Sequence, residues 1–448
     1  MDGFTSDTIA AIATPRGNGG VGIIRISGTA VTKIAAAIIK PPLRTRHALF
    51  TPFVDAEGET IDSGIVLYFP APASYTGEDI LELQCHGGSI ILDMVLKRIL
   101  TLGARLANPG EFTERAFLNN KIDLAQAEAV ADLIESSTEQ AARSAQKSMQ
   151  GVFSGKIHEL VTELTELRTF VEAAIDFVDE DIDFLSDGVV ENRIIRLSEQ
   201  IQGVLKTARQ GRLLREGMTV VLAGKPNAGK SSLLNALAGH DAAIVTDVAG
   251  TTRDVLKEHI QIDGMPLHII DTAGLRDSDE AVEKEGIRRA REEINKADKV
   301  LLLIDVQDPE HRSILATMPG DINLTKIYNK IDLLGLEPEI TESDCGAQIY
   351  LSIKTGKGLD LLRQHLKNSV GFNAATENVF IARRRHIEAL KKSFDFVQSA
   401  LGQLQNNQAG ELVAEDLRQA QNSLAEITGQ FSSDDLLGHI FSSFCIGK

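Results

Sequence analysis

The chain has 448 residues, a formal net charge of −17 and three cysteines, Cys85, Cys345 and Cys445. This length allows two to four domains with a large core. The negative charge argues against indiscriminate electrostatic binding to nucleic acid, and three cysteines make neither a disulfide framework nor a zinc site. Because no apolar run has membrane-spanning length and no secretory signal opens the chain, we expect a cytoplasmic protein with no membrane part.

Residues 1–120 mix strand-like runs with turns. Strands are expected at Gly20–Ile26, Ile61–Phe69 and Ile80–Gln84, and one amphipathic helix is expected at Ile90–Leu102. The mixture predicts an N-terminal α+β domain.

Residues 121–215 and 371–448 are two helical segments. Glycine and proline almost vanish from 121–215, while alanine, leucine, glutamate and glutamine recur at helical spacing. The acidic stretch Asp176–Asp183 interrupts this segment; it either binds a metal or forms a solvated connection, and the connection is favoured. The second segment is expected to be helical from Val379 to Phe444.

Residues 216–370 alternate strands with helices, as a nucleotide-binding α/β domain does. Strands are expected at Leu267–Ile270, Thr325–Tyr328 and Gln348–Leu351, and Asp263-Gly264 marks a hairpin beside them. An antiparallel pair beside a parallel sheet is typical of a Ras-like domain. With helical sequence on both sides, we expect this domain to be inserted into a loop of a helical domain.

Residues 224–231 read Gly-Lys-Pro-Asn-Ala-Gly-Lys-Ser, a complete phosphate-binding loop. The loop lies between an expected strand at Met218–Ala223 and an expected helix at Ser231–Ala238, which is the context the motif needs. Inward-pointing backbone N–H groups and the helix N-terminus attract phosphate oxygens. Lys230 would reach the β- and γ-phosphates, and Ser231 would bind magnesium.

Four further motifs follow in the order that a GTPase requires. They are Gly250–Asp254, which can complete the magnesium shell, Asp271–Gly274, which can meet magnesium and the γ-phosphate, and the base-contacting Asn329–Asp332 and Ser352–Lys354. The carboxylate of Asp332 can accept two hydrogen bonds from guanine, and adenine lacks that pair of donors. The sequence therefore predicts a GTP-binding protein.

The residue after the Asp-x-x-Gly motif is Leu275. Small GTPases often place a glutamine there to orient the attacking water. Because an apolar side chain cannot hold water, we expect another group to take this role. The acidic segment Arg276–Glu285 either closes over the nucleotide or is a solvated loop.

Over its whole length the chain resembles the tRNA modification GTPase family called MnmE or TrmE. The resemblance rests on Gly19–Gly28, Ser74–Asp79, Pro109–Thr113 and the terminal Phe444-Cys445-Ile446-Gly447-Lys448. A GTPase has no general reason to end in Cys-Ile-Gly-Lys, so this last segment is the most specific.

The resemblance implies that residues 1–120 bind folate and form a constitutive homodimer. The implied ligands of a tetrahydrofolate derivative, in its 5-formyl or methylene form, are Arg25, Glu82, Lys121 and Lys448. A glutamate can accept hydrogen bonds from the pterin, and cations can pair with the carboxylates of folate. The tail would place Cys445 near the reacting carbon, either as a nucleophile or as part of the wall of the site.

The resemblance also implies activation by potassium and by pairing of the GTPase domains. Potassium would bind Asn227, Thr246, Val248 and Thr251, magnesium would bind Ser231 and Thr252, and Glu283 would orient the catalytic water. The motifs and the resemblance together assign GTP binding to Asn227, Ala228, Gly229, Lys230, Ser231, Ser232, Thr246, Asp247, Val248, Ala249, Gly250, Thr251, Thr252, Asp271, Thr272, Ala273, Gly274, Asn329, Lys330, Asp332, Ser352, Ile353 and Lys354.

The function that follows is a potassium-stimulated GTPase taking part in carboxymethylaminomethyl modification at carbon-5 of the tRNA wobble uridine, with the FAD-dependent partner MnmG (GidA). Two alternatives stay open. One is a regulatory GTPase of ribosome assembly, which should bind no folate, and the other is a folate-dependent transferase with a degenerate GTPase domain. Residues Arg383–Arg385 either form a basic patch for nucleic acid or a solvated helix face.

Overall fold

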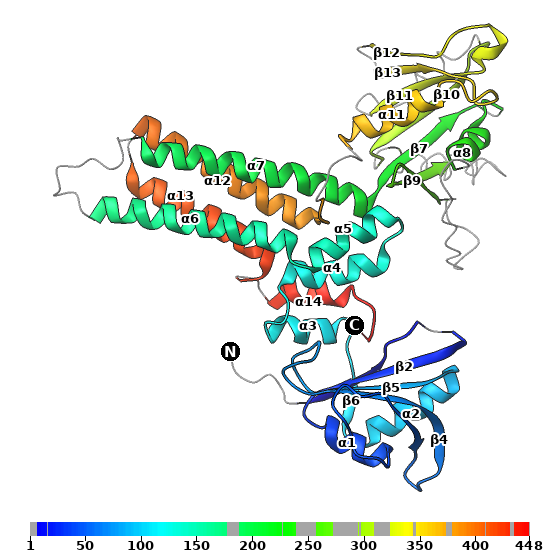
Figure 1. Ribbon diagram of the computed structural model, residues 1–448. Coiled ribbons are helices and arrows are strands. Elements are labelled where there is room, and N and C mark those ends of the chain that lie inside the picture. Colours follow the sequence, from blue (N-terminus) through cyan, green and yellow to red (C-terminus); the bar gives the residue numbers. More distant parts are fainter. Residues whose placement is uncertain are drawn as a thin grey trace, which may run out of the picture. The chain divides into compact units, whose positions relative to one another are not determined.

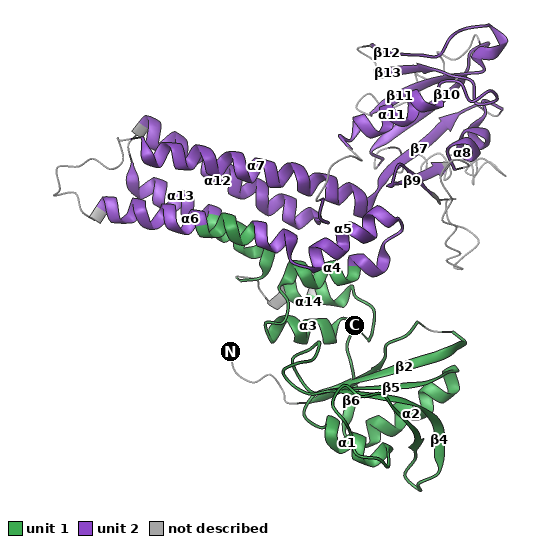
Figure 2. Cartoon of the chain, in the orientation of Figure 1, with its two compact units in different colours: residues 1–131, 157–162, 421–448 green, residues 132–156, 163–420 purple. Residues whose placement is uncertain are grey.

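A computed structural model of the chain describes residues 7–15, 17–176, 188–225, 227–238, 257–271, 294, 297–308, 323–343, 346–372, 379–407, 409–430 and 434–447. The chain divides into two compact units (Figures 1 and 2). Unit 1 comprises Met1–Ala131, Ile157–Thr162 and Gln421–Lys448, and unit 2 comprises Asp132–Lys156 and Glu163–Ala420. No helix in the described part of the chain is long and apolar enough to cross a membrane.

Unit 1 contains a mixed sheet in the strand order β3-β4-β5-β2-β1-β6. Neighbouring strands are antiparallel except β1 and β6, which are parallel. Helices α1 and α2 cover one face, because their apolar residues share a core with alternate residues of the strands. The strands and helices are β1 (Thr8–Ile12), β2 (Gly19–Ser27), α1 (Val31–Ile38), β3 (Leu49–Val54), β4 (Thr60–Phe69), β5 (Ile80–Gly87), α2 (Ser89–Thr101) and β6 (Ala104–Leu106).

Two further helices of unit 1 pack against each other. Helix α3 (Glu111–Leu118) follows the sheet, and α14 (Asp434–Ser442) comes from the far end of the chain. The rings of Phe117 and Phe441 lie 6.3 Å apart, and Phe441 and Phe444 share a core with the start of α4 (Leu124–Glu135). The last residues of the chain therefore belong to the N-terminal unit.

The helices of unit 2 are long. Helices α7 (Val189–Glu216) and α12 (Arg384–Asn407) run antiparallel and side by side, as their paired side chains show: Gln398 donates to Ser198, and Gln405 donates to Glu191 (Figure 1). Helix α5 (Glu139–Met149) also lies in unit 2. Helices α6 (Val152–Asp176) and α13 (Gly410–Thr428) are divided between the units, because Ile157–Thr162 and the residues from Gln421 onward belong to unit 1.

The second sheet, also in unit 2, has the order β12-β13-β11-β10-β7-β9-β8 within the described residues. Its centre is parallel, while β8 pairs antiparallel with β9 and β12 with β13. Apolar residues fill both faces of β7 and β10, as in a parallel sheet covered on both sides. The elements are β7 (Met218–Gly224), α8 (Lys230–Ala238), β8 (Lys257–Ile262), β9 (Met265–Asp271), β10 (Lys299–Asp305), β11 (Leu324–Asn329), η2 (Ile331–Leu333), β12 (Glu339–Ser343), β13 (Gly346–Tyr350) and α11 (Leu359–Ser369).

The predicted fold class is confirmed: an α+β N-terminal domain, a helical domain and a Ras-like α/β domain inserted in it. The hairpin predicted at Asp263-Gly264 joins β8 to β9. The sequence analysis missed β12, which adds a second antiparallel edge. The proposed break at Asp176–Asp183 lies almost entirely outside the described residues.

The helix expected from Val379 begins only at Arg384. The reason lies in the contacts of residues 379–383. The backbone N–H of Ile381 donates to the hydroxyl of buried Ser148 at 2.9 Å, and this hydroxyl reaches the Ile381 carbonyl at 3.2 Å. Phe380 stacks on Phe153 with ring centroids 4.6 Å apart. These contacts occupy the backbone groups that a helix would need.

Candidate functional site

The phosphate-binding loop connects β7 to α8, as the motif requires. Gly229 has φ +104°, and a β-carbon there would lie 2.7 Å from Nδ2 of Asn329, so the position needs glycine. The ammonium of buried Lys230 donates to the carbonyls of Gly224 at 2.9 Å and Lys225 at 3.1 Å. This lysine is thus held inside the loop, within reach of the space where phosphates would lie.

Asn329 joins three of the predicted motifs. Its Nδ2 donates to the carbonyl of Ala228 in the phosphate-binding loop at 2.9 Å, and its Oδ1 accepts from the N–H of Ile353 at 3.1 Å. Asn329 as a whole is 4% exposed, so both bonds are shielded from water. Asn329 therefore links the phosphate-binding loop to the base-contacting segment at Ser352–Lys354.

The predicted base-contacting motif Asn329–Asp332 presents an exposed carboxylate. Oδ1 of Asp332 accepts from the hydroxyl of Ser352 at 2.6 Å, which orients the group. Beside it, Nζ of Lys330 binds Oδ2 of Asp305 at 2.6 Å, and this hydrogen bond lowers the pKa of Asp305. The sequence analysis did not single out Asp305, although it ends β10 at the same edge of the sheet as Asn329.

The structure describes only some of the remaining residues that were predicted to bind GTP. Ser231 and Ser232 are exposed at the start of α8, exposed Asn227 has φ +64°, and Lys354 is exposed. The backbone of Asp271 ends β9 opposite Leu222 of β7, near the phosphate-binding loop. Outside the described residues lie Thr246, Asp247, Val248, Ala249, Gly250, Thr251, Thr252, Thr272, Ala273, Gly274, Leu275 and Glu283.

A second candidate site lies on the sheet of unit 1. Arg25 of β2 and Glu82 of β5 are direct partners across the two strands, and Nε donates to Oε1 at 2.9 Å. Alternation along β2 buries Ile24 and Ile26 in the core and turns Arg25 to the opposite face. The two side chains are 25% and 16% exposed, so a ligand can still reach the pair.

Aromatic rings and the end of the chain surround this pair. The Arg25 guanidinium lies 6.0 Å from the ring centre of Tyr75 and 5.8 Å from that of Phe112. The Tyr75 hydroxyl is 2.9 Å from that of Thr113, and burial raises the pKa of this phenol, which stays neutral. Nη1 of Arg25 also donates to the carbonyl of Gly447 at 3.3 Å.

The chain end is held by two more contacts. Ile446 forms a bridge with Pro109, and the N–H of Gly110 donates to the carbonyl of Cys445 at 3.4 Å. The thiol-bearing Cys445 is exposed, whereas burial raises the pKa of Cys85 to about 12. Lys121 donates to the carbonyl of Pro72, on the loop that also carries Tyr75. Lys448 lies outside the described residues.

Comparison with known proteins identifies the family. The solved structure of the FeoB G-domain from Methanococcus jannaschii is 24% identical in sequence. The alignment covers 34% of this chain and 98% of the FeoB chain, with a TM-score of 0.26. The family description MnmE helical domain matches residues 124–445, and GTP-binding protein TrmE N-terminus matches residues 8–121. Curated proteins called tRNA modification GTPase MnmE, from Hydrogenovibrio crunogenus and Histophilus somni, are 57% and 59% identical. They cover 100% and 99% of this chain and all of their own length.

The chain belongs to the MnmE family of tRNA modification GTPases. The predicted resemblance and the prediction of a GTP hydrolase are both confirmed. Hydrogen bonds through Asn329 and Ser352 bring together the loop at 224–231 and the two base-contacting motifs, as a guanine-nucleotide site requires.

Three residues of the candidate site in unit 1 were not predicted as site residues from the sequence. Tyr75, Phe112 and Thr113 surround Arg25, and the signal for them was available: all three lie in the segments Ser74–Asp79 and Pro109–Thr113 that carried the resemblance. An arginine paired with a carboxylate between two aromatic rings suits a flat, hydrogen-bonding ring system with carboxylates.

Proposed function

We propose that this chain hydrolyses GTP in the carboxymethylaminomethyl modification of carbon-5 of the tRNA wobble uridine. The observation that carries the proposal is identity of 57% along the whole chain to a protein called tRNA modification GTPase MnmE. Since GTP has no atom to give to uridine in this chemistry, its hydrolysis would drive a conformational change. Working on tRNA, the protein would act in the cytoplasm.

In this proposal the chain's residues have separate roles. Asp332 and Asn329 select and hold guanine, and Lys230 neutralises phosphate charge. Bound magnesium, held by Ser231 and Thr252, would supply further charge neutralisation. Arg25, Glu82 and Lys121, with Lys448 from the tail, would hold a 5-formyl or methylene tetrahydrofolate, whose one-carbon unit is the chemistry that the cofactor supplies.

We also propose a homodimer, an FAD-dependent partner protein and the bounds of the domains. The N-terminal residues 1–120 would form a homodimer, and an FAD-dependent MnmG (GidA) protein would complete the modifying complex. The helical domain would comprise residues 121–215 and 371–448, with the GTPase domain at 216–370. The distinct sheets of units 1 and 2 support separate folate and GTP sites.

Mass spectrometry of wobble nucleosides tests the function. Cells that lack this chain should lose the carboxymethylaminomethyl nucleoside, and an intact copy of the chain should restore it. A regulatory GTPase of ribosome assembly would leave the nucleoside unchanged and would bind no folate. Full modification in the deleted cells would rule out the proposal.

Potassium should stimulate GTP hydrolysis strongly. Leu275 cannot position water, and a cation can replace part of the rate gain of about 10³–10⁵ that an arginine finger supplies elsewhere. Asn227 supports the placement of this cation, since its exposed side chain lies on the phosphate-binding loop at φ +64°. Asn227→Ala should remove most of the stimulation and spare nucleotide binding, as measured by hydrolysis rates in potassium and in sodium. Equal rates in the two salts would refute the cation site.

Glu283→Ala should lower the hydrolysis rate by about 10²–10⁴, the range for losing a general base or its equivalent. The reason is that Glu283 would orient the catalytic water through a bridging water. GTP affinity, measured by nucleotide titration, should hardly change. Glu280→Ala is the matched control and should be nearly neutral. Similar losses in both variants would mean that another carboxylate has this role.

A further inference from the structure

One buried carboxylate holds both connections between the helices and the GTPase domain. The Asp132 side chain, on α4, is 2% exposed. It accepts from Nε of Arg215 at 2.7 Å and from Nη2 of Arg383 at 2.8 Å. Breaking a buried ion pair is costly because it leaves an uncompensated charge, so this cluster keeps the three side chains together.

The two arginines stand at the two ends of the inserted domain. Arg215 is in the last turn of α7, and β7 begins three residues later at Met218. Arg383 immediately precedes α12, where the chain returns to the helices. A β-carbon on Gly211 would lie 1.8 Å from the carbonyl of Phe380, so the two connections touch one another. Asp132 therefore binds the chain segments on both sides of the inserted GTPase domain.

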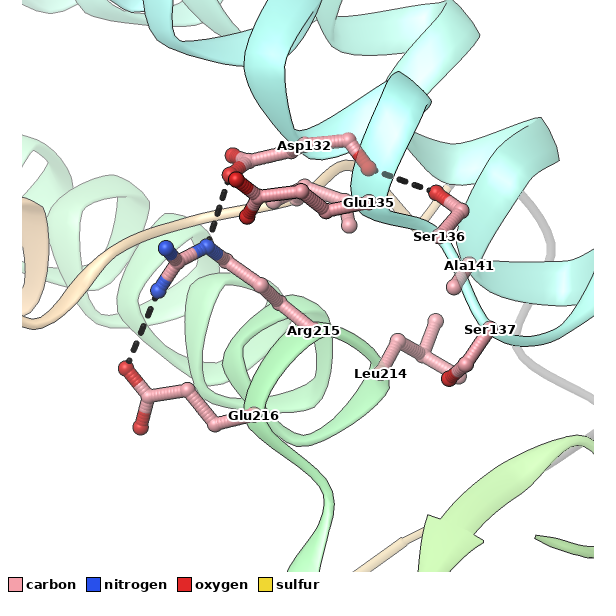
Figure 3. Close-up of a pocket in the computed structure, with 9 residues that line it drawn as sticks. Asp132, Glu135, Ser136, Ser137, Ala141, Leu214, Arg215 and Glu216 are labelled. Carbon is pink, nitrogen blue, oxygen red and sulfur yellow. Dashed lines mark hydrogen bonds and ion pairs between the residues drawn. The ribbon is translucent and has the colours of Figure 1, made fainter. Parts of the chain in front are cut away.

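Arg215 has a second carboxylate within reach. Its Nη1 lies 3.4 Å from Oε1 of exposed Glu216, and Figure 3 shows the guanidinium between Glu216 and Asp132. All three side chains line a pocket of about 260 Å³. This volume gives a guanidinium room to move from one carboxylate towards the other. Glu216 thus offers Arg215 an alternative partner to Asp132.

The sheet of the GTPase domain contacts Glu216, the residue next to Arg215. Nε2 of His268, on β9, donates to the carbonyl of Glu216 at 2.8 Å. Between the two elements, Gly217 has φ +69°, and a β-carbon there would lie 2.7 Å from the same nitrogen. Strand β9 ends at Asp271, which opens the motif that meets the γ-phosphate. A displacement of β9 would therefore move the backbone beside Arg215.

We propose that Asp132 is a positioning residue that couples GTP hydrolysis to tRNA modification. In one of two nucleotide states, bound GDP or bound GDP plus aluminium fluoride, Asp132 holds Arg215 and Arg383 together. In the other nucleotide state, β9 moves the Glu216 backbone through His268 and draws Arg215 towards Glu216. The loss of this contact with Asp132 loosens the second connection, at residues 379–383. The part that concerns modification rests on the proposed function, whereas the movement of the connections does not.

Hydrogen exchange of the full-length chain, with GDP and with GDP plus aluminium fluoride, tests the movement. In the unaltered chain, protection of residues 379–383 should differ between the two states. Asp132→Asn keeps the shape of the side chain and removes its charge, and it should abolish this difference. Glu135→Gln is the matched control, because Glu135 is an exposed carboxylate on the same helix and lines the same pocket. It should behave like the unaltered chain.

Two activities complete the test. Asp132→Asn should hydrolyse GTP within about twofold of the normal rate, while modification should fall by about tenfold, the size of a typical coupling between sites. His268→Leu should have the same effect, and His268→Gln should rescue it, because glutamine restores an N–H donor. His268 is only partly buried, so this pair decides the matter if Asp132→Asn does not fold.

Three results would overturn the inference. The first is a nucleotide-dependent difference at 379–383 that persists in Asp132→Asn or, should that variant not fold, in His268→Leu. The second is an equal loss of hydrolysis and modification, which a purely structural role would produce. The third is failure of His268→Gln to restore what His268→Leu removes. If the unaltered chain modifies no tRNA, the proposed function fails, and hydrogen exchange alone then decides the coupling.

Discussion

Removal of Cys445–Lys448 should abolish modification of the wobble uridine and leave potassium-stimulated GTP hydrolysis nearly intact. The tail lies at the candidate folate site of unit 1: the carbonyl of Gly447 accepts from Arg25 at 3.3 Å, and Ile446 bridges to Pro109. The GTPase motifs lie within residues 216–370, so their local structure does not depend on the tail. The measurement is mass spectrometry of wobble nucleosides from cells that carry only the truncated chain, beside a hydrolysis assay.

Single substitutions separate the roles within the tail. Cys445→Ser keeps the backbone carbonyl that accepts from Gly110, so it removes only the exposed thiol. Loss of modification in Cys445→Ser would indicate a chemical role for the thiol, and retention would indicate that the cysteine only lines the site. Lys448→Ala tests the expected ion pair with folate by its effect on folate affinity. Normal modification by the truncated chain would refute the placement of the tail.

Asp332→Asn should change the preferred base from guanine to xanthine. Ser352 donates its hydroxyl hydrogen to Oδ1 of Asp332, so the oxygen of an asparagine would keep this bond and turn its amide towards the base. The amide donor would then face the guanine donors, but it would suit the second carbonyl of xanthine. A site built for one hydrogen-bonding pattern rejects the wrong partner by about 10⁴–10⁵. Competition between GTP and XTP measures the change.

Ser352→Ala is the control for this substitution. It leaves the carboxylate in place and removes only the group that orients it. Affinity for GTP should fall by about tenfold, in keeping with the loss of one hydrogen bond to a charged group. The preference for guanine should remain. An unchanged GTP preference in Asp332→Asn would show that the base is read elsewhere.

The motifs of the candidate GTP site could be recognised in the sequence because each of them is local. The loop at 224–231 is recognised by spacing alone, since its glycines and its lysine act within one strand–loop–helix unit. Burial on both faces of the parallel sheet gave the apolar run that marked β7, whereas β10 was not predicted. The limits of helices were less predictable, because the side chain of Ser148 occupies the backbone of Ile381 across 233 residues.

The sequence by itself determined the family, the fold class and the guanine-binding motifs, since each depends on residues near one another in the chain. Only the tertiary structure decided which charges act together. The resemblance implied Arg25 and Glu82 as ligands, but only the structure shows that they pair with each other and that Arg25 also contacts Tyr75 and a carbonyl 422 residues away. Asp132 binds Arg215 and Arg383, which lie 83 and 251 residues from it in the sequence. Contacts across such separations leave no periodic pattern, and folding alone brings these groups together.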